Sequence, residues 1–244
     1  MIETRTRGDR PRKSVWRGIV VAAALPFIGL GLMQAANGAP EQAVVIPAPT
    51  QDLAQSGATA KAIFAGGCFW GVQGVFQHTE GVLNAVSGYA GGDAASASYD
   101  LVSAGRTTHA ETVEITYDPS VVTYGELMHI YFSVAHNPTQ LNYQGPDRGP
   151  HYRSAIFYQS EQEKAVAEAY IAQLDAAGVY PDPVVTTLEP FEAFYPAEDY
   201  HQDFMTLNPT WPYIVYHDLP KLEAMKQIFP DMYRKDPVLV SEAM

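Results

Sequence analysis

The chain of 244 residues contains a single cysteine, Cys68. One cysteine cannot form a disulfide within the chain, so the fold must be held together without one. Because Cys68 has no stapling role, it is either a small buried hydrophobic residue or a reactive thiol. Its sequence context has to decide between the two.

Basic residues are few beyond the N-terminus. The formal net charge is −12, from 15 Lys and Arg and 27 Asp and Glu. Residues 1–40 contain six of the basic and two of the acidic side chains, which leaves 9 basic and 25 acidic side chains in the remainder. So acidic a body repels phosphate backbones, and we exclude nucleic acid as a partner.

No apolar run reaches the roughly 20 residues that span a membrane comfortably. The longest, of sixteen residues from Gly18 to Met33, follows a basic stretch that ends at Arg17. A basic flank at the extreme N-terminus favours an export signal over a buried core helix. We predict a signal peptide or an uncleaved N-terminal membrane anchor over residues 1–38. The protein is then expected in the bacterial periplasm, or anchored to the inner membrane and facing outward.

The rest of the chain is predicted to form one folded domain. Residues 39–60 have the Ala, Pro, Gln, Thr and Ser composition of a linker, the domain covers 61–235, and 236–244 form a C-terminal tail. Strands and helices in mixed order predict an α+β fold. Strands are expected over 62–65, 83–86, 112–117, 154–158 and 184–188, helices over 68–77, after capping residues 123 and 160, and over 197–207, with a long loop over 137–153.

Cys68 follows Gly66-Gly67 at the end of a predicted strand and opens a predicted helix. Unpaired backbone N–H groups and the positive end of the helix dipole meet at such a position, which favours thiolate over thiol. This context makes a reactive thiol as plausible as an inert cysteine.

Glu111 shares the alternation of Val113, Ile115 and Tyr117, so it points toward the core if the strand includes it. A desolvated carboxyl has a raised pKa and can act as a general acid near neutral pH. If the strand begins one residue later, Glu111 is simply solvated. Tyr89 and Tyr152 are each expected in a glycine-containing loop, from which a phenol could donate to a substrate oxygen. The seven histidines show no ligand spacing, so we expect no metal.

Several motifs resemble those of the A-type peptide methionine sulfoxide reductases. The most specific is Gly66-Gly67-Cys68-Phe69-Trp70-Gly71. Others follow in the family's order over roughly residues 61–230: Val86-Ser87-Gly88-Tyr89-Ala90-Gly91-Gly92, His109-Ala110-Glu111, Tyr117-Asp118-Pro119, Tyr152-Arg153-Ser154-Ala155-Ile156 and the run from Phe194 to Gln202.

The resemblance implies a two-layer α+β sandwich around a mixed sheet and a thiol-based reduction of the S epimer of methionine sulfoxide, free or in proteins. It implies roles for seven residues: Cys68 as nucleophile, Glu111 as general acid, Tyr89 and Tyr152 as contacts of the sulfoxide oxygen, Asp147 in a polar network, and Phe69 and Trp70 as the aromatic pocket for the methyl group. No bound cofactor is implied, and we expect a monomer.

Many members of that family carry resolving cysteines, and this chain has none. It therefore resembles the one-cysteine subgroup, whose sulfenic acid is reduced by an external thiol: a thioredoxin-like protein, a glutaredoxin or a small thiol. Tyr143 also stands where the family commonly has arginine.

Two other functions stay open: a cysteine hydrolase that uses Cys68 with His109 or His201, and a tethered binding domain with an inert Cys68.

Overall fold

The computed structural model describes residues 1–2, 43–54 and 57–240. The predicted export segment therefore lies almost wholly outside the described residues. Within them, no helix combines the length and the apolar character that crossing a membrane requires.

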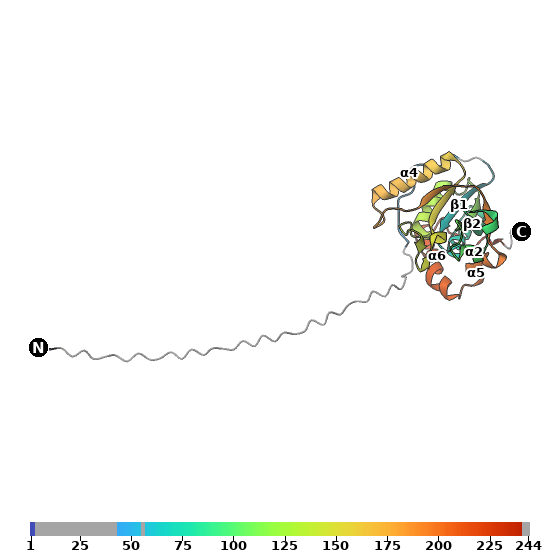
Figure 1. Cartoon of the computed structure of the whole chain (residues 1–244). Coiled ribbons are helices and arrows are strands. Elements are labelled where there is room, and N and C mark those ends of the chain that lie inside the picture. The colour runs from blue at the N-terminus through green and yellow to red at the C-terminus, as the bar shows by residue number, and fades with distance from the viewer. Residues whose placement is uncertain (3–42, 55–56, 241–244) are drawn as a thin grey trace. The chain divides into compact units, whose positions relative to one another are not determined.

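A six-stranded mixed sheet forms the centre of the domain (Figure 1). Its order is β7-β6-β1-β3-β2-β8, and only β6 and β7 run parallel. The strands are β1 (Ala60–Gly66), β2 (Val82–Ala90), β3 (Ala110–Tyr117), β6 (Ser154–Tyr158), β7 (Thr187–Pro190) and β8 (Phe194–Pro196). The predicted α+β class is thereby confirmed.

The central strand β1 is buried on both faces, because its alternating residues enter two separate cores. Ala62 and Phe64 join the large core beneath the helices, whereas Ile63 and Ala65 join a small core on the opposite face. The helices that supply the large core are α1 (Phe69–Gln77), α3 (Tyr124–Ile130), α4 (Glu161–Ala177), α5 (Phe204–Leu207) and α6 (Leu219–Ile228). The domain is therefore a layer of helices on one side of a sheet, as the resemblance implied.

Capping residues mark helix boundaries as predicted. Thr123 and Glu126 form a reciprocal capping box at the start of α3. At the start of α4, Ser160 accepts from the N–H of Glu163, but the Glu163 carboxylate accepts from Gln159. The predicted helix over 197–207 is interrupted: a 3-10 turn over Asp199–His201 precedes the short helix α5. Helix α6 was not predicted.

Part of the stretch predicted to be a linker lies against the domain. Residues 43–54 form no helix or strand, and Ile46 is buried. The backbone of Val44 donates to the carbonyl of Ser133 at 2.9 Å, and Asp52 accepts from the N–H of Gly125 at 2.8 Å. This segment, residues 43–54, is called the strap below.

Candidate active site

Cys68 is the N-cap residue of α1 and is half-buried. The chain turns from β1 into α1 through Gly67, whose φ is +87°. A Cβ on Gly67 would lie 2.5 Å from the side chain of Gln144, so both the conformation and the space require glycine. The Gly-Gly pair therefore serves to place the thiol at a strand-to-helix junction, as the sequence predicted.

The resting thiol is not activated by its helix position alone. Burial raises the pKa of Cys68, and the carboxylates of Glu111, Asp218 and Asp147 raise it further. A hydrogen bond from the backbone N–H of Trp70 lowers that pKa but does not reverse the shift. The expectation that the helix terminus favours a thiolate is therefore wrong for the resting site, because desolvation and nearby negative charge outweigh it.

Glu111 lies on β3 with its side chain in the core, which confirms the inward orientation suggested by the alternation. Its Oε2 accepts from the backbone N–H of Phe69 at 3.1 Å, one residue after Cys68. Burial raises the pKa of Glu111 to about 8, and the charge of Asp147 adds to the rise. Glu111 is therefore largely protonated at neutral pH and can donate a proton.

The glycines around Tyr89 suggested a loop, but Tyr89 lies in a strand. Strand β2 continues through Gly88, and Tyr89 lies opposite Glu111 in the antiparallel register. Its hydroxyl donates to Oε2 of Glu198 at 2.9 Å. Tyr89 therefore reaches the expected place, but its proton already has an acceptor.

Tyr152 ends a 3-10 turn, Pro150–Tyr152, in the predicted long loop. It is half-buried, and burial, Glu111, Asp147 and Cys68 all raise its pKa. Among the described residues its hydroxyl has no hydrogen-bond partner. The structure thus brings this phenol near the thiol and the acid with its proton available.

Asp147 lies in the same loop, on β5 (Asp147–Arg148), which pairs with β4 (Tyr143–Gln144). It accepts a 2.5 Å hydrogen bond from the hydroxyl of Tyr213. Sequence reasoning missed Tyr213, which approaches from a distant part of the chain without any local motif. Burial raises the pKa of Tyr213, and the charge of Cys68 raises it further.

The two expected aromatic residues lie at the start of α1 in a cluster of rings. Phe69 is buried between Tyr89 and His201, at centroid distances of 5.9 and 5.1 Å. Trp70 is half-buried and stacks on Phe204 at 3.8 Å with an interplanar angle of 9°. An apolar methyl group would find ring faces here, next to the thiol.

A buried charge pair packs under the first turn of α1. Asp218 and Lys221 lie 3.5 Å apart, with side chains 0% and 6% exposed. A Cβ on Gly71 would lie 2.1 Å from Oδ1 of Asp218, so this glycine lets the carboxylate approach the helix. The i, i+3 spacing of an acid and a base after Pro212 was the one sequence signal for this pair, and sequence reasoning overlooked it.

The histidines proposed as a hydrolase base are engaged elsewhere. Nε2 of His109 is 2.9 Å from the carbonyl of Asp93, and Nδ1 of His201 accepts from the indole N–H of Trp70 at 3.1 Å. In the part of the chain that the structure describes, no histidine forms a hydrogen bond with the Cys68 sulfur. Nor do those residues contain a group of three or more His, Cys, Asp or Glu that could hold a metal ion.

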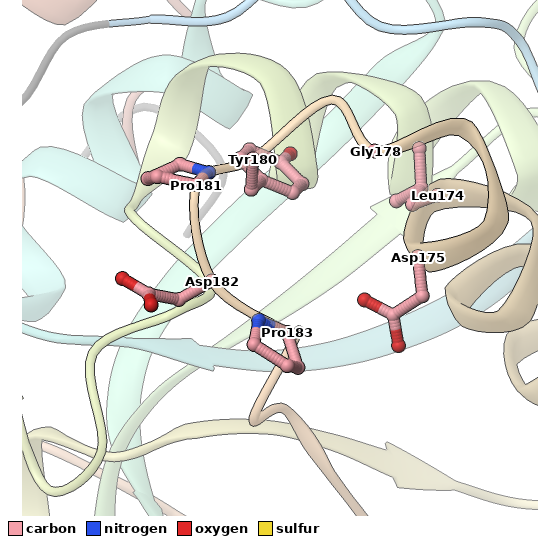
Figure 2. A pocket seen from close by; sticks show the side chains of 7 residues that line it. All are labelled: Leu174, Asp175, Gly178, Tyr180, Pro181, Asp182 and Pro183. Carbon is pink, nitrogen blue, oxygen red and sulfur yellow. The ribbon is translucent and has the colours of Figure 1, made fainter.

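A hollow of about 310 Å³ at the end of α4 is lined by none of these groups (Figure 2). It is lined by Leu174, Asp175, Gly178, Tyr180, Pro181, Asp182 and Pro183. It contains no thiol, and the Asp175 carboxylate accepts from the backbone of Val184 at 2.9 Å. The chemistry is therefore assigned to Cys68, Glu111 and the surrounding phenols, which can supply a sulfur nucleophile and a proton to one bound oxygen.

Comparisons with known proteins agree with this arrangement. A family model described as peptide methionine sulfoxide reductase matches residues 60–233. The chain is 65% identical to peptide methionine sulfoxide reductase MsrA 2 of Mesorhizobium japonicum, over 75% of this chain and 93% of that protein. It is 51% identical to MsrA 2 of Synechocystis, over 77% and 89%. Methionine sulfoxide reductase A of Corynebacterium diphtheriae superposes with a TM-score of 0.54 and 34% identity, covering 72% of this chain and 88% of that one.

Proposed function

The chain belongs to the peptide methionine sulfoxide reductase family, and we propose that Cys68 and Glu111 carry out the family's reaction here. The enzyme is a thiol-dependent peptide-methionine (S)-S-oxide reductase: it reduces methionine sulfoxide to methionine. Such a reaction repairs oxidative damage to methionine.

The chemistry needs a proton on oxygen and a nucleophile on sulfur at the same time. Glu111 gives its proton to the sulfoxide oxygen, with Tyr152 as a further donor, and this makes the substrate sulfur electrophilic. The Cys68 thiol passes its proton to the Glu111 carboxylate, and its sulfur attacks the substrate sulfur to form a sulfur–sulfur bond. The S–O bond and the sulfur–sulfur bond then break as the hydroxyl moves to Cys68, which leaves a sulfenic acid on Cys68 and releases methionine. The two electrons come from the Cys68 sulfur.

The observation that carries this assignment is the burial of the Glu111 carboxyl beside Cys68. This carboxyl has a pKa of about 8 and lies one hydrogen bond from the backbone next to Cys68. A hydrolase would need an imidazole at the sulfur and would have no use for a buried acid there. A binding domain with an inert cysteine would leave both groups unexplained.

Recycling must come from outside the chain, because Cys68 is the only cysteine. One external thiol attacks the sulfenic sulfur and releases water, and a second thiol resolves the mixed disulfide. The half-exposed position of Cys68 supports access by a thioredoxin-like protein, a glutaredoxin or a small thiol. We further propose that the enzyme is a monomer. We also propose that it is exported to the periplasm or anchored by residues 1–38, because these residues have the charge and apolar pattern of an export segment.

The decisive experiment is a single turnover without any reductant. Monomeric enzyme with an excess of the S epimer should release about one methionine per enzyme, the one-thiol limit. Mass spectrometry should find one added oxygen on the Cys68 peptide. Two methionines per enzyme, or no trappable oxidised Cys68, would contradict the mechanism.

A matched control uses Cys68→Ser. Serine preserves the size and the N-cap position, so the variant should fold and show no reduction. Its activity with a small thiol present should stay below about a tenth of wild type, since typical nucleophile losses are far larger. The R epimer serves as the second control and should not react with wild-type enzyme.

A further inference from the structure

Exposed aromatic residues gather in one short part of the chain. Within the described residues, three of the large exposed hydrophobic side chains are aromatic: Tyr200, Trp211 and Tyr216. They are 62%, 52% and 49% exposed. Leu207 and Val215 lie in the same stretch and are 63% and 50% exposed. These five residues are called the aromatic rim.

Each aromatic residue of the rim connects to Trp70 through other rings. Trp211 contacts Phe204 at 6.1 Å, and Phe204 stacks on Trp70. Tyr200 contacts His201 at 4.3 Å, and His201 lies 5.8 Å from Trp70. The rim is thus continuous with the start of the catalytic helix.

The third connection runs along the π-helical turn Ile214–Asp218. Tyr216 contacts His217 at 4.8 Å, His217 contacts Tyr213 at the same distance, and Tyr213 meets the edge of Trp70 at 6.0 Å. Tyr213 also holds Asp147 of the site. Three separate series of ring contacts therefore connect the exposed rings to Trp70.

We propose that the aromatic rim binds the apolar residues that flank methionine sulfoxide in an unfolded polypeptide. This inference rests on the proposed function and specifies its substrate. Exposed Trp and Tyr contribute large contact area at low cost in side-chain entropy, and they accept many partner sequences. A repair enzyme that meets methionine in many contexts needs such tolerance.

The dimensions suit an extended peptide. The centroids along the path through Phe204 place the Trp211 ring at most about 10 Å from Trp70, and an extended chain rises about 3.3 Å per residue. Side chains within roughly three positions of the sulfoxide therefore reach the rim. Free methionine sulfoxide does not extend that far and gains nothing from it.

The test compares three substrates with dithiothreitol as reductant: free methionine S-sulfoxide, an unstructured peptide with leucines beside the sulfoxide, and the same peptide with glycine and serine instead. The variant combines Trp211→Ala and Tyr216→Ala. We expect its kcat/KM on the leucine peptide to fall about tenfold, mainly through KM, a typical loss for two half-exposed aromatic contacts. Its kcat/KM on the other two substrates should change less than twofold.

The matched control combines Leu83→Ala and Val121→Ala, which removes exposed apolar side chains (45% and 59% exposed) outside the rim. It should leave all three substrates unaffected. A second rim variant, Trp211→Gln with Tyr216→Gln, replaces each ring with a polar side chain suited to the surface and should reproduce the loss if the first folds poorly.

Three outcomes would overturn the proposal: an equal loss on all substrates, no loss on the leucine peptide, or a loss that occurs only when a thioredoxin-like protein replaces dithiothreitol. The last result would assign the rim to the reductant. If the wild-type enzyme reduces none of the substrates, the proposed function itself fails. If it reduces all of them and the rim variant matches it, only the rim inference fails.

Discussion

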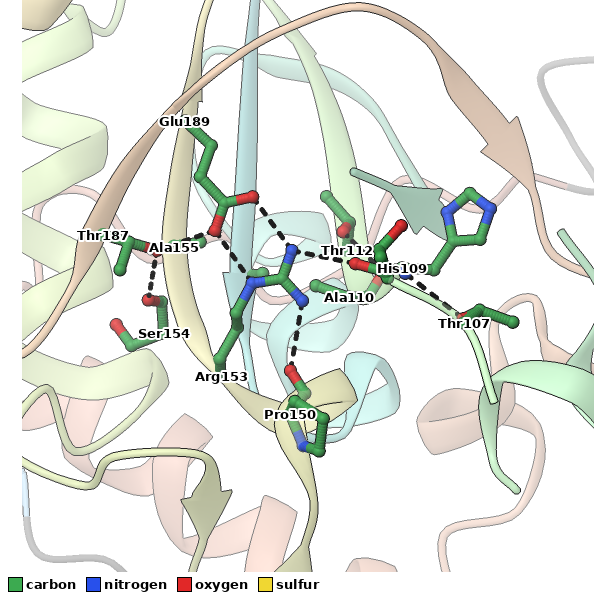
Figure 3. Close-up of polar contacts among 12 residues, drawn as sticks. Thr107, His109, Ala110, Thr112, Pro150, Arg153, Ser154, Ala155, Thr187 and Glu189 are labelled. Atoms are coloured by element: carbon green, nitrogen blue, oxygen red, sulfur yellow. Dashed lines mark hydrogen bonds and ion pairs between the residues drawn. The ribbon is translucent and has the colours of Figure 1, made fainter. Parts of the chain in front are cut away.

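Two glutamates on the same sheet, Glu189 and Glu111, have pKa values shifted in opposite directions. Glu189, on β7, forms a bidentate pair with Arg153 at 2.8 and 2.9 Å (Figure 3). Although burial opposes the shift, the hydrogen bonds and charge of Arg153 keep the pKa of Glu189 below its ordinary value. Glu111, on β3, has no cationic side chain among the groups that shift its pKa, and burial raises that pKa to about 8.

The difference shows how the site obtains its acid. Arg153 directly follows Tyr152, yet its guanidinium is bound by Glu189 and by the carbonyls of Thr108 and Pro150 (Figure 3). A cation free to approach Glu111 would favour the ionised carboxylate and remove the proton that the sulfoxide needs. Glu189 thus neutralises the arginine next to Tyr152, and Glu111 keeps its raised pKa.

The largest effect that separates the two carboxyls is on turnover. Glu111→Gln should lower kcat by roughly 10²-fold or more, with a much smaller change in KM, because proton donation matters most in the transition state. Glu189→Gln should lower kcat less than threefold, because that carboxyl donates no proton. Steady-state kinetics with a small thiol measure both.

Unchanged kcat in Glu111→Gln would mean that Glu111 is not the acid. A large loss in Glu189→Gln together with a normal KM would mean that the released Arg153 reaches Glu111.

The second effect is on stability, and the two carboxyls have opposite signs. The pKa of Glu111 is about 8 in the folded protein and near 4.5 in the unfolded chain. Between these two pH values the folded protein holds a proton that the unfolded chain has lost, so folding becomes less favourable as pH rises from 4.5 to 8. Glu111→Gln removes this penalty, and its free energy of unfolding relative to wild type should grow by on the order of a few kcal/mol from pH 5 to pH 8.

Glu189 gives the reverse slope. Its folded pKa is lowered, so the pair with Arg153 stabilises the fold above the unfolded value of 4.5 and is lost as pH falls below it. Glu189→Gln should cost about 1 kcal/mol at pH 7 for this pair, whose side chains are 15% and 26% exposed, and less at pH 4. Urea titrations at several pH values measure both slopes, and parallel slopes would refute the assignment.

The third effect is on the thiol itself. The charge of Glu111 raises the pKa of Cys68, so Glu111→Gln should move the midpoint of alkylation by iodoacetamide to lower pH. At pH 9, where wild-type Glu111 is ionised, alkylation should be about tenfold faster in the variant, the effect of one pKa unit. Glu189→Gln should leave the profile as in wild type. Identical profiles in all three proteins would show that Glu111 and Cys68 are not electrostatically coupled.

The sequence predicted the site residues whose position depends on local pattern, but not those whose position depends on tertiary contacts. Alternation along β3 located Glu111 on the core face, and Gly66-Gly67 before a helix located Cys68. Tyr89 was misplaced in a loop because its glycine neighbours suggested a turn, whereas pairing of β2 with β3 and β8 extends the strand through them. A single-sequence pattern contains no information on such tertiary pairing.

Charge around the thiol was also beyond reach of the sequence. Asp218 and Tyr213 come to Cys68 from positions about 150 residues away, through the packing of α1 against α6 and the π-helical turn before it. Burial of the thiol and the charges of Glu111, Asp218 and Asp147 raise the pKa of Cys68, against the shift expected from the helix terminus. The strap was missed for the same reason, because its contacts with Ser133 and Gly125 depend on the folded surface and leave no periodicity in residues 43–54.

The smallest effect distinguishes the two phenols. The Tyr152 hydroxyl keeps its proton available among the described residues, whereas Tyr89 donates to Glu198. Tyr152→Phe should therefore lower kcat/KM about fivefold, the usual contribution of one hydrogen bond of about 1 kcal/mol. Tyr89→Phe should lower kcat/KM less than twofold. The effect of Tyr89→Phe should grow when it is combined with Glu198→Gln, because an amide accepts more weakly and leaves the Tyr89 proton for the substrate. Kinetics of these variants on the free S epimer measure this order. A larger loss in Tyr89→Phe than in Tyr152→Phe would show that substrate binding breaks the contact with Glu198, which would make Tyr89 the stronger partner of Glu111.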